Sequence, residues 1–206
     1  MEAAFVAKKR GHEVVLCEKG DSLGGLVKLA AVPIAKQELT KVIQYMERKL
    51  IREGVEIRLN CEVTEEMLKN EFAGYEVIAG TGADPIVVNA FTAFKHCVTA
   101  DDILAGKRCR KEVVVIGGGS VGCETADYLA PLVNDLFPRN REIILLEMAD
   151  GIMLQESGPG RSLLTQRMMK KGIQIHCKAK VEKVEAEKIY YTENGEEHCI
   201  SDADTL

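Results

Sequence analysis

The chain has 206 residues, of which 46% are hydrophobic and 29% charged, a balance typical of a globular protein with one large domain or two small ones. Its formal net charge of −5 argues against a nucleic-acid groove or an anionic membrane surface, since both need clustered positive charge. The N-terminus does not have the pattern of a signal peptide and no apolar run approaches the ~20 residues of a membrane span, so we expect a cytoplasmic protein. Two short basic stretches, 8–10 and 107–111, are interpreted as solvated helix ends and loops.

The first half of the chain predicts helices and strands in alternation. The opening segment is rich in alanine, a strong helix former, and Gly11 stands where a helix cap is expected. Short apolar runs are typical of buried parallel strands, and apolar residues at helical spacing before Gly54 predict a long helix. An N-cap at Thr64 with two acids after it predicts a short helix. We therefore expect helices at 1–10, at 34–52 and from Thr64, and strands at Val14–Cys17, Val55–Leu59 and Tyr75–Ala79.

The second half starts with a connector, 87–111, that holds a short helix around Asp101–Leu104. The strongest strand signal of the chain follows and runs directly into a glycine-rich loop. Near the end the apolar period changes, and Asn194-Gly195 is typical of a hairpin turn, so we expect an antiparallel meander. We predict helices at Val121–Leu132 and Arg161–Lys171, strands at Val113–Ile116, Ile143–Leu146 and Ile173–Cys177, and the meander at Val181–Val184, Lys188–Thr192 and Glu197–Ile200.

The two cycles of alternating strand and helix predict an α/β fold of the doubly wound, Rossmann-like kind. The second cycle combines a parallel sheet with the meander. We place the boundary between two domains within 92–111, which gives a first domain at 1–92 and a second at 93–206.

The seven cysteines contain no C-x-x-C pair and no Cys/His cluster with metal-ligand spacing. We therefore expect free thiols that behave mostly as small buried hydrophobes, and no metal site. The four histidines are scattered along the chain, and none is expected to be a ligand or a catalytic base.

The glycine-rich loop is Gly117-Gly118-Gly119-Ser120-Val121-Gly122, a G-x-G-x-x-G pattern between a predicted strand and a predicted helix. Gly117 permits a tight turn, Gly119 lets a pyrophosphate approach the backbone, and Gly122 lets the helix pack against the strand. The pyrophosphate would face unpaired N–H groups at the positive end of the helix dipole. The pattern predicts a dinucleotide site.

Glu147 ends the next strand, where a dinucleotide site places an acid that binds the ribose hydroxyls of the adenosine half. It lies 25 residues after Gly122, and an insertion at 131–141 explains the long spacing. A carboxylate repels a 2′-phosphate, and residues 148–150 supply no arginine that would bind one, so NAD(H) is favoured over NADP(H). Arg139 or Arg141 would weaken this preference if either folded back toward Glu147.

The N-terminal 18 residues repeat the order helix, glycine, apolar strand and terminal acid, which ends here at Glu18. We expect the chain to begin inside a βαβ unit whose first strand and glycine loop would precede Met1. The chain resembles the two-dinucleotide-domain flavoproteins. The resemblance lies in Glu18-Lys19-Gly20, in Leu23-Gly24-Gly25, in the run 77–82, and in the second loop with Glu124 two residues after its last glycine. Within these, the chain is most similar to the C-terminal part of the NADH:flavin oxidoreductases that include 2-enoate reductase and 2,4-dienoyl-CoA reductase.

The resemblance implies a role for each of several residues. Glu18, with Lys19 in the same site, would bind the FAD ribose, and Gly24 and Gly25 would lie along the FAD. Val63 would sit near the adenine, and Glu124 would line the nicotinamide pocket, although its place near a helix start also suits a structural role. The cofactor-binding set is completed by Gly80-Thr81-Gly82, which would pass close to the FAD.

The resemblance also implies the reaction of a longer protein. A partial FAD domain would be interrupted by the NAD(H) domain, and relatives carry an N-terminal barrel with FMN and an iron–sulfur cluster. Electrons would run from NADH to FAD and onward to an activated C=C bond. The chain is expected to be a fragment, inactive and colourless alone, and no catalytic residue is assigned. The absent C-x-x-C pair argues against the disulfide reductase branch.

Two alternatives stay open. In the first, the chain is a non-catalytic module that binds ADP or NAD. In the second, it is part of an electron donor that resembles the small subunit of glutamate synthase. In every case the expected partners are NADH and the rest of its own polypeptide, with no nucleic acid and no membrane, and a homo-oligomer is left open.

Overall fold

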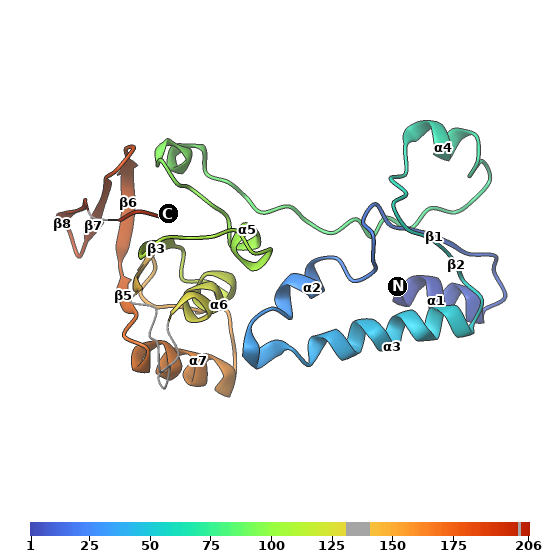
Figure 1. Ribbon diagram of the computed structural model, residues 1–206, viewed down its shortest axis with the longest axis horizontal. Helices are drawn as coiled ribbons and strands as arrows, with labels where there is room; N and C mark the ends of the chain where they lie inside the picture. Colours follow the sequence, from blue (N-terminus) through green and yellow to red (C-terminus); the bar gives the residue numbers. More distant parts are fainter. Residues whose placement is uncertain (131–140, 202) are drawn as a thin grey trace. The chain divides into compact units, whose positions relative to one another are not determined.

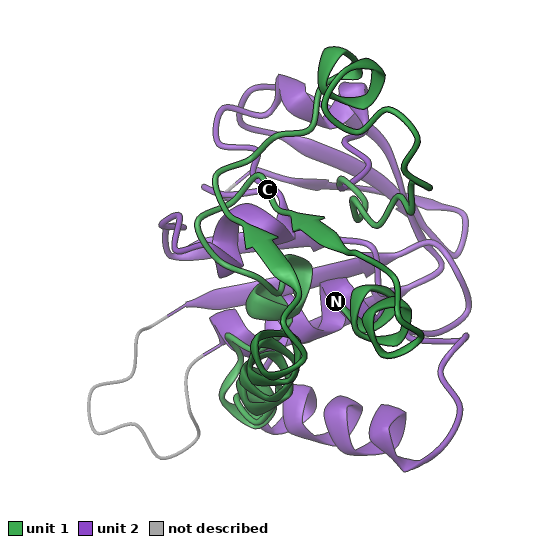
Figure 2. Ribbon diagram, turned by 90° about the vertical axis from the view of Figure 1, so that its right-hand side faces the viewer, with its two compact units in different colours: residues 1–84 green, residues 85–206 purple. Residues whose placement is uncertain are grey.

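The computed structural model describes residues 1–130, 141–201 and 203–206. The chain divides into two compact units, Met1–Asp84 (unit 1) and Pro85–Leu206 (unit 2), coloured separately in Figure 2. The division precedes the segment 92–111 because the start of the connector belongs to unit 2. There Phe94 is buried in a cluster that also includes Ile189 and Leu206.

Unit 1 is built on a parallel pair of strands, β1 and β2, with Val15 opposite Glu56. Its core is a small cluster in which Phe5, Leu50 and Val55 are buried. The elements are α1 (Glu2–Lys9), β1 (Val15–Cys17), α2 (Leu26–Ala30), the 3₁₀ turn η1 (Ile34–Lys36), α3 (Leu39–Arg52), β2 (Glu56–Arg58) and α4 (Glu65–Lys69), shown in Figure 1.

Most elements of unit 1 confirm the sequence predictions. The Thr64 side chain accepts a hydrogen bond from the Met67 N–H (3.3 Å), as its N-cap pattern predicts. The predicted strand at Tyr75–Ala79 is wrong, since these described residues form no strand. Val77 and Ile78 are 61% and 72% exposed, because a β-branched run needs a neighbouring strand to pair with and the sheet described in this unit has two strands.

Unit 2 holds a parallel sheet in the order β3-β4-β5 and an antiparallel meander in the order β6-β7-β8. Thr205 forms a parallel bridge to Val113 of β3. The elements are the 3₁₀ segment η2 (Asn89–Ala93), α5 (Ala100–Leu104), β3 (Glu112–Ile116), α6 (Ser120–Leu129), β4 (Glu142–Glu147), α7 (Pro159–Lys170), β5 (Gln174–Cys177), β6 (Ala179–Val184), β7 (Ile189–Glu193) and β8 (Glu196–Ile200).

The two faces of this sheet carry two separate clusters, because successive residues of a strand point to opposite faces. Val113 and Leu145 pack with α5, α6 and α7, whereas Val114 and Leu146 pack with the meander and Leu206. The hairpin turn between β7 and β8 has positive φ at Asn194 (51°) and Gly195 (89°), as the sequence predicts. The mixed α/β architecture with parallel strands and a meander confirms the predicted fold class.

No helix in the described chain is long and apolar enough to cross a membrane.

Candidate dinucleotide-binding site

The glycine loop connects β3 to α6 at the carboxyl edge of the parallel sheet. Gly117 has φ +102°, a conformation that favours glycine, and its N–H donates to the Leu146 carbonyl (2.9 Å). A Cβ on Gly122 would overlap the Gly117 carbonyl oxygen, so the first turn of α6 lies directly against the loop. These two glycines are therefore required by the fold itself.

The two middle glycines differ sharply from each other. A Cβ on the buried Gly118 would lie 2.7 Å from Ile152 Cγ2 and 2.9 Å from Glu147 Cβ, so this position also requires glycine, which sequence reasoning missed. Gly119 is exposed, has an ordinary φ of −69°, and has no described heavy atom within 4 Å of an added Cβ. Nothing in the described protein requires a glycine at 119.

The start of α6 is open to an anion. Gly119 is the N-cap residue, and no side chain of the described chain caps this ten-residue helix. Its first N–H groups therefore point outward at the positive end of the helix dipole. The Ser120 hydroxyl donates instead to the exposed Glu156 carboxylate (2.5 Å), which brings a negative charge to the same helix end.

Glu147, at the end of β4, uses both carboxylate oxygens to hold the loop. Oε2 accepts from the Gly118 N–H (2.6 Å), and Oε1 accepts from the Ala149 N–H (2.7 Å). Charge-assisted bonds of this kind are short and strong. Each oxygen still has lone-pair capacity for a further donor such as a ribose hydroxyl.

The cations near Glu147 are not those that the sequence suggested. Arg141 lies at the amino end of β4, where its guanidinium donates to the carbonyls of Arg110 (3.1 Å) and Leu129 (3.2 Å), and Arg139 lies outside the described residues. Instead, Lys178 Nζ lies 3.7 Å from Asp150 Oδ1, just after β4, and Arg161 lies against Gly151. The order of strands and helices could have indicated these two cations, since the carboxyl ends of β4 and β5 and the start of α7 meet at one edge of the sheet.

Two side chains of α6 lie one turn into the helix. Cys123 is fully buried, and its thiol donates to the Gly118 carbonyl (3.3 Å). Burial, together with the nearby Glu147 carboxylate, raises the pKa of Cys123 to about 12, so this thiol is protonated at neutral pH and is not a nucleophile. Glu124 is half-buried in the same turn. All seven cysteines are free thiols, and the described residues contain no cluster of three or more metal-ligating side chains.

Glu18 of unit 1 forms the same kind of turn as Glu147. Its Oε1 accepts from the Gly20 N–H (2.8 Å), and its carbonyl accepts from the Cys61 N–H (2.9 Å). Gly24 has φ +114° and packs against α3, since an added Cβ would lie 2.9 Å from Ile43 Cδ1. Among the described residues no hydrogen bond joins Glu18 to the other positions predicted near FAD. Of these positions Gly24 is half-buried, and the others are exposed, namely Lys19, Gly25, Val63 and Gly80-Thr81-Gly82.

A family model described as pyridine nucleotide-disulphide oxidoreductase matches residues 1–206. The chain belongs to this oxidoreductase family. Its glycine loop between a parallel strand and a helix, with an acid at the end of the next strand, has the arrangement of a Rossmann-type fold.

Relatives of this oxidoreductase chain extend the likeness to nearly its whole length. It is 34% identical over 205 residues, 98% of the chain, to cinnamate reductase of Clostridium sporogenes, and 35% identical over 179 residues, 84% of the chain, to NADH oxidase of Thermoanaerobacter brockii. The solved structure of 2-naphthoyl-CoA reductase in complex with 2-naphthoyl-CoA superposes with a TM-score of 0.86 over 99% of the chain, at 26% identity. The chain spans 30%, 26% and 30%, respectively, of the length of these three proteins.

Proposed function

We propose that the loop at 117–122 binds NADH, and that the chain is the pyridine-nucleotide module of an FAD-dependent oxidoreductase that reduces an activated C=C bond. The observation that carries this proposal is Gly119. The fold requires glycine at 117, 118 and 122, but only a ligand against the backbone gives a reason for glycine at 119. That ligand would face the uncapped start of α6.

The cofactors fit the chain's own residues in different degrees. The pyrophosphate of NADH would lie against the first N–H groups of α6, from Ser120 to Gly122, and its adenosine ribose would meet Glu147. Glu124 would line the nicotinamide side. When bound, NADH and FAD supply the redox chemistry, a hydride transfer from nicotinamide to flavin, and the chain supplies binding and orientation.

The choice of NADH over NADPH rests on Glu147. Its carboxylate lies at the ribose position and repels a 2′-phosphate, and Asp150 neutralises part of the charge of Lys178. Arg161 beside Gly151 is the cation that would oppose this preference. A direct comparison of the two dissociation constants decides the question, and NADPH that binds as tightly as NADH would contradict our choice.

The assignment of FAD to residues 1–92 rests on the repeated turn at Glu18 and on the relatives. The names cinnamate reductase and 2-naphthoyl-CoA reductase both describe reductases of unsaturated acids or thioesters. We propose that Glu18, Lys19, Gly24, Gly25, Val63 and Gly80-Thr81-Gly82 contact FAD, that residues 93–206 form the NAD(H) domain, and that FMN and an iron–sulfur cluster belong to a separate part of the whole protein.

Binding of NADH to this chain is the first test. Gly119→Ala should weaken NADH binding about tenfold or more by crowding the pyrophosphate, while leaving the fold intact. Gly160→Ala is the matched control, since Gly160 is exposed in α7 and has no described atom within 4 Å of an added Cβ. Equal affinities of the Gly119→Ala variant, the Gly160→Ala variant and the unchanged chain, measured by NADH fluorescence, would refute binding at this loop.

A second experiment separates catalysis from simple binding. In the natural protein that carries this chain, NADH added without oxygen should bleach the absorbance of bound FAD. Saturation-transfer NMR on the chain should also show NADH binding tighter than ADP, because the nicotinamide half adds contacts near Glu124. Unbleached FAD together with equal affinities for ADP and NADH would instead support a non-catalytic nucleotide module.

A further inference from the structure

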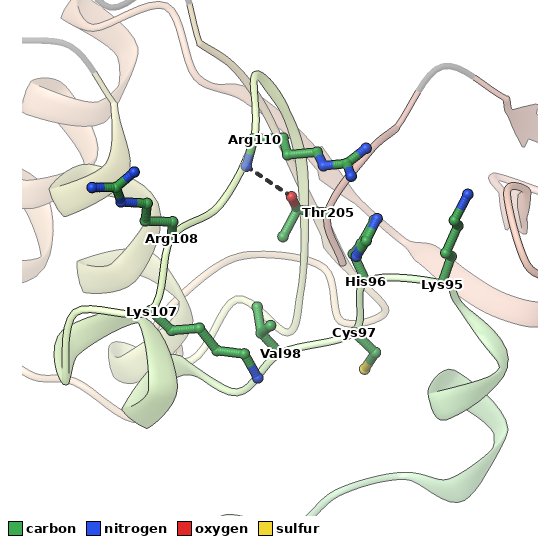
Figure 3. A pocket seen from close by; sticks show the side chains of 8 residues that line it. All are labelled: Lys95, His96, Cys97, Val98, Lys107, Arg108, Arg110 and Thr205. Atoms are coloured by element: carbon green, nitrogen blue, oxygen red, sulfur yellow. Dashed lines mark hydrogen bonds between the residues drawn. The ribbon is translucent and has the colours of Figure 1, made fainter.

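A cavity of about 220 Å³ lies in unit 2, at the opposite end of β3 from the glycine loop. Arg110 precedes β3, and the neighbouring Thr205 bridges to Val113, whereas the loop follows Ile116. At about 3.3 Å per strand residue, the two ends of β3 are about 13 Å apart. The cavity is lined by Lys95, His96, Cys97, Val98, Lys107, Arg108, Arg110 and Thr205, shown in Figure 3.

Four of the eight lining residues are permanent cations, which makes this cavity electropositive. Figure 3 shows the ends of the Lys95, His96 and Arg110 side chains on one side of the segment 95–98, the Lys107 side chain on the other side, and the Arg108 side chain directed away. Lys95 and Lys107 have acidic neighbours, Glu187 at 3.8 Å and Asp102 at 3.3 Å. Both are exposed pairs, and such pairs neutralise charge weakly.

Arg110 is a cation whose charge the described protein does not neutralise. No described side chain forms an ion pair or hydrogen bond with its guanidinium, and its backbone N–H donates to the Thr205 hydroxyl (3.0 Å). Thr205 is 2% exposed, and its hydroxyl donates to Asp204 Oδ1 (3.4 Å), so one carboxylate lies next to this lining residue.

His96 supplies an independent observation. Its Nε2 atom is buried and has no hydrogen-bond partner among the described residues. The backbone of His96 is fixed, because its carbonyl accepts from the Leu206 N–H (3.1 Å). A buried polar atom without a partner is costly, and the His96 imidazole would gain a partner by turning toward an anion in the cavity.

We infer that this cavity binds a phosphate group, held by Arg110 and Lys95 and hydrogen-bonded by His96. The volume accommodates one tetrahedral anion and is smaller than the 300–1,000 Å³ typical of pockets for whole organic ligands. The ligand is therefore inorganic phosphate or the terminal phosphate of a larger molecule. The Arg110 guanidinium can donate two parallel hydrogen bonds to such an anion, and the two positive charges of Arg110 and Lys95 favour a phosphate, which carries up to two negative charges, over a singly charged carboxylate. The site is separate from the nucleotide loop, and its existence does not depend on NADH binding.

Residue-resolved NMR of the chain with inorganic phosphate tests this inference. Amide signals of His96, Cys97 and Arg110 should shift saturably with phosphate, and they should not shift with chloride at equal ionic strength. Phosphate bound only at the glycine loop would move Gly118 and Gly119 instead, and that result would overturn the inference. Ribose 5-phosphate as a second probe distinguishes the sources, since tighter binding than inorganic phosphate indicates a phosphomonoester, and equal binding indicates the free ion.

Two variants and a matched control sharpen the test. Arg110→Gln should weaken phosphate binding about tenfold, and Lys170→Gln, which removes one exposed cation of α7, should leave it unchanged. His96→Leu removes the orphaned nitrogen, so the variant without phosphate should keep its melting temperature or gain stability, while the phosphate-induced rise in melting temperature shrinks. If Lys170→Gln weakened phosphate binding as much as Arg110→Gln, the binding would depend only on the net charge of the protein, and that result would contradict the site.

Discussion

Unit 1 and unit 2 build the same turn at the end of a strand, from different sequences. Glu18 accepts a hydrogen bond from the N–H two residues later at 2.8 Å, and Glu147 does so at 2.7 Å. In each unit a residue just after the neighbouring strand has positive φ, 52° at Asn60, two residues after β2, and 56° at Lys178, directly after β5. Each of these residues donates its N–H back to the turn, to Gly20 O and Ala149 O respectively.

The two turns differ in what the second carboxylate oxygen does. In Glu147 it accepts from the glycine loop, whereas among the described residues Glu18 has no second protein donor. Unit 2 also buries two hydrophobic clusters, and unit 1 buries one small cluster. The comparison teaches that the acid turn combines a local hydrogen bond with one from the end of the neighbouring strand in both units, and that in unit 2 the loop joins it to a helix start that suits an anion.

The largest expected effect separates the glycines of the loop. Gly122→Ala places a methyl group on the Gly117 carbonyl, and because backbone cannot yield as a side chain does, we expect unit 2 to lose about 3 kcal/mol or more of stability. Gly119→Ala should cost less than about 1 kcal/mol, since the site is open. Urea denaturation measures both, and comparable losses would show that position 119 is constrained by the fold after all.

The second effect compares how each unit joins its helices. In unit 2, Asp127 of α6 binds Arg167 (2.9 and 3.0 Å) and the buried Lys171 (3.0 Å) of the α7 end. Asp127→Ala leaves Lys171 buried without a carboxylate, so we expect a loss of about 3 kcal/mol.

The matching pair in unit 1 joins α1 to α3. Glu2 lies 3.4 Å from Lys49, and it is 61% exposed. Glu2→Ala should therefore cost at most about 0.5 kcal/mol, partly because Lys49 also lies over the Phe5 ring. Hydrogen exchange assigns each loss to its unit, and an Asp127→Ala variant as stable as Glu2→Ala would show that the contact between α6 and α7 is held by apolar packing alone.

The third prediction tests the two acids directly with glutamine. The Glu18→Gln side chain can turn its one oxygen toward the Gly20 N–H, so the cost should be a few tenths of a kcal/mol. Glu147→Gln cannot satisfy two N–H groups with one oxygen, and its amide must face either Gly118 N–H or Ala149 N–H, at a cost of about 1–3 kcal/mol. Thermal denaturation of both variants measures the two losses of stability. Equal losses would show that Glu147 does not need both carboxylate oxygens to hold the loop.

The smallest effect comes from exchanging the residues of positive φ. Asparagine adopts this conformation more readily than lysine, so Lys178→Asn should stabilise unit 2 by about 0.5 kcal/mol and Asn60→Lys should destabilise unit 1 by a similar amount. Shifts of the same sign in the two chemical denaturation midpoints would indicate that side-chain contacts, and not the backbone, decide these positions.

Local patterns in the sequence predicted much of this structure because they specify local geometry. The G-x-G-x-x-G loop, the Asn194-Gly195 hairpin and the Thr64 cap each depend on a few consecutive residues. The strand predicted at 75–79 failed because a strand needs a partner, which a single segment cannot encode.

In the candidate site, too, the residues set by local patterns were predicted and those set by distant contacts were not. The sequence alone predicted Glu147 at the carboxyl edge of the sheet, since an acid that ends a strand beside a glycine loop is a local pattern. The cations Lys178 and Arg161 were missed because they reach this edge from other elements. The steric need for glycine at 118 depends on Ile152, more than thirty residues away, and was equally out of reach.

The open space above Gly119 has a consequence for how such loops change during evolution. A descendant that had stopped using its nucleotide would be free to place almost any small side chain at position 119 and still fold, while positions 117, 118 and 122 would stay fixed by sterics. Under the proposed nucleotide binding, glycine at 122 would be kept as long as unit 2 folds, whereas glycine at 119 would be kept only as long as the site binds its ligand.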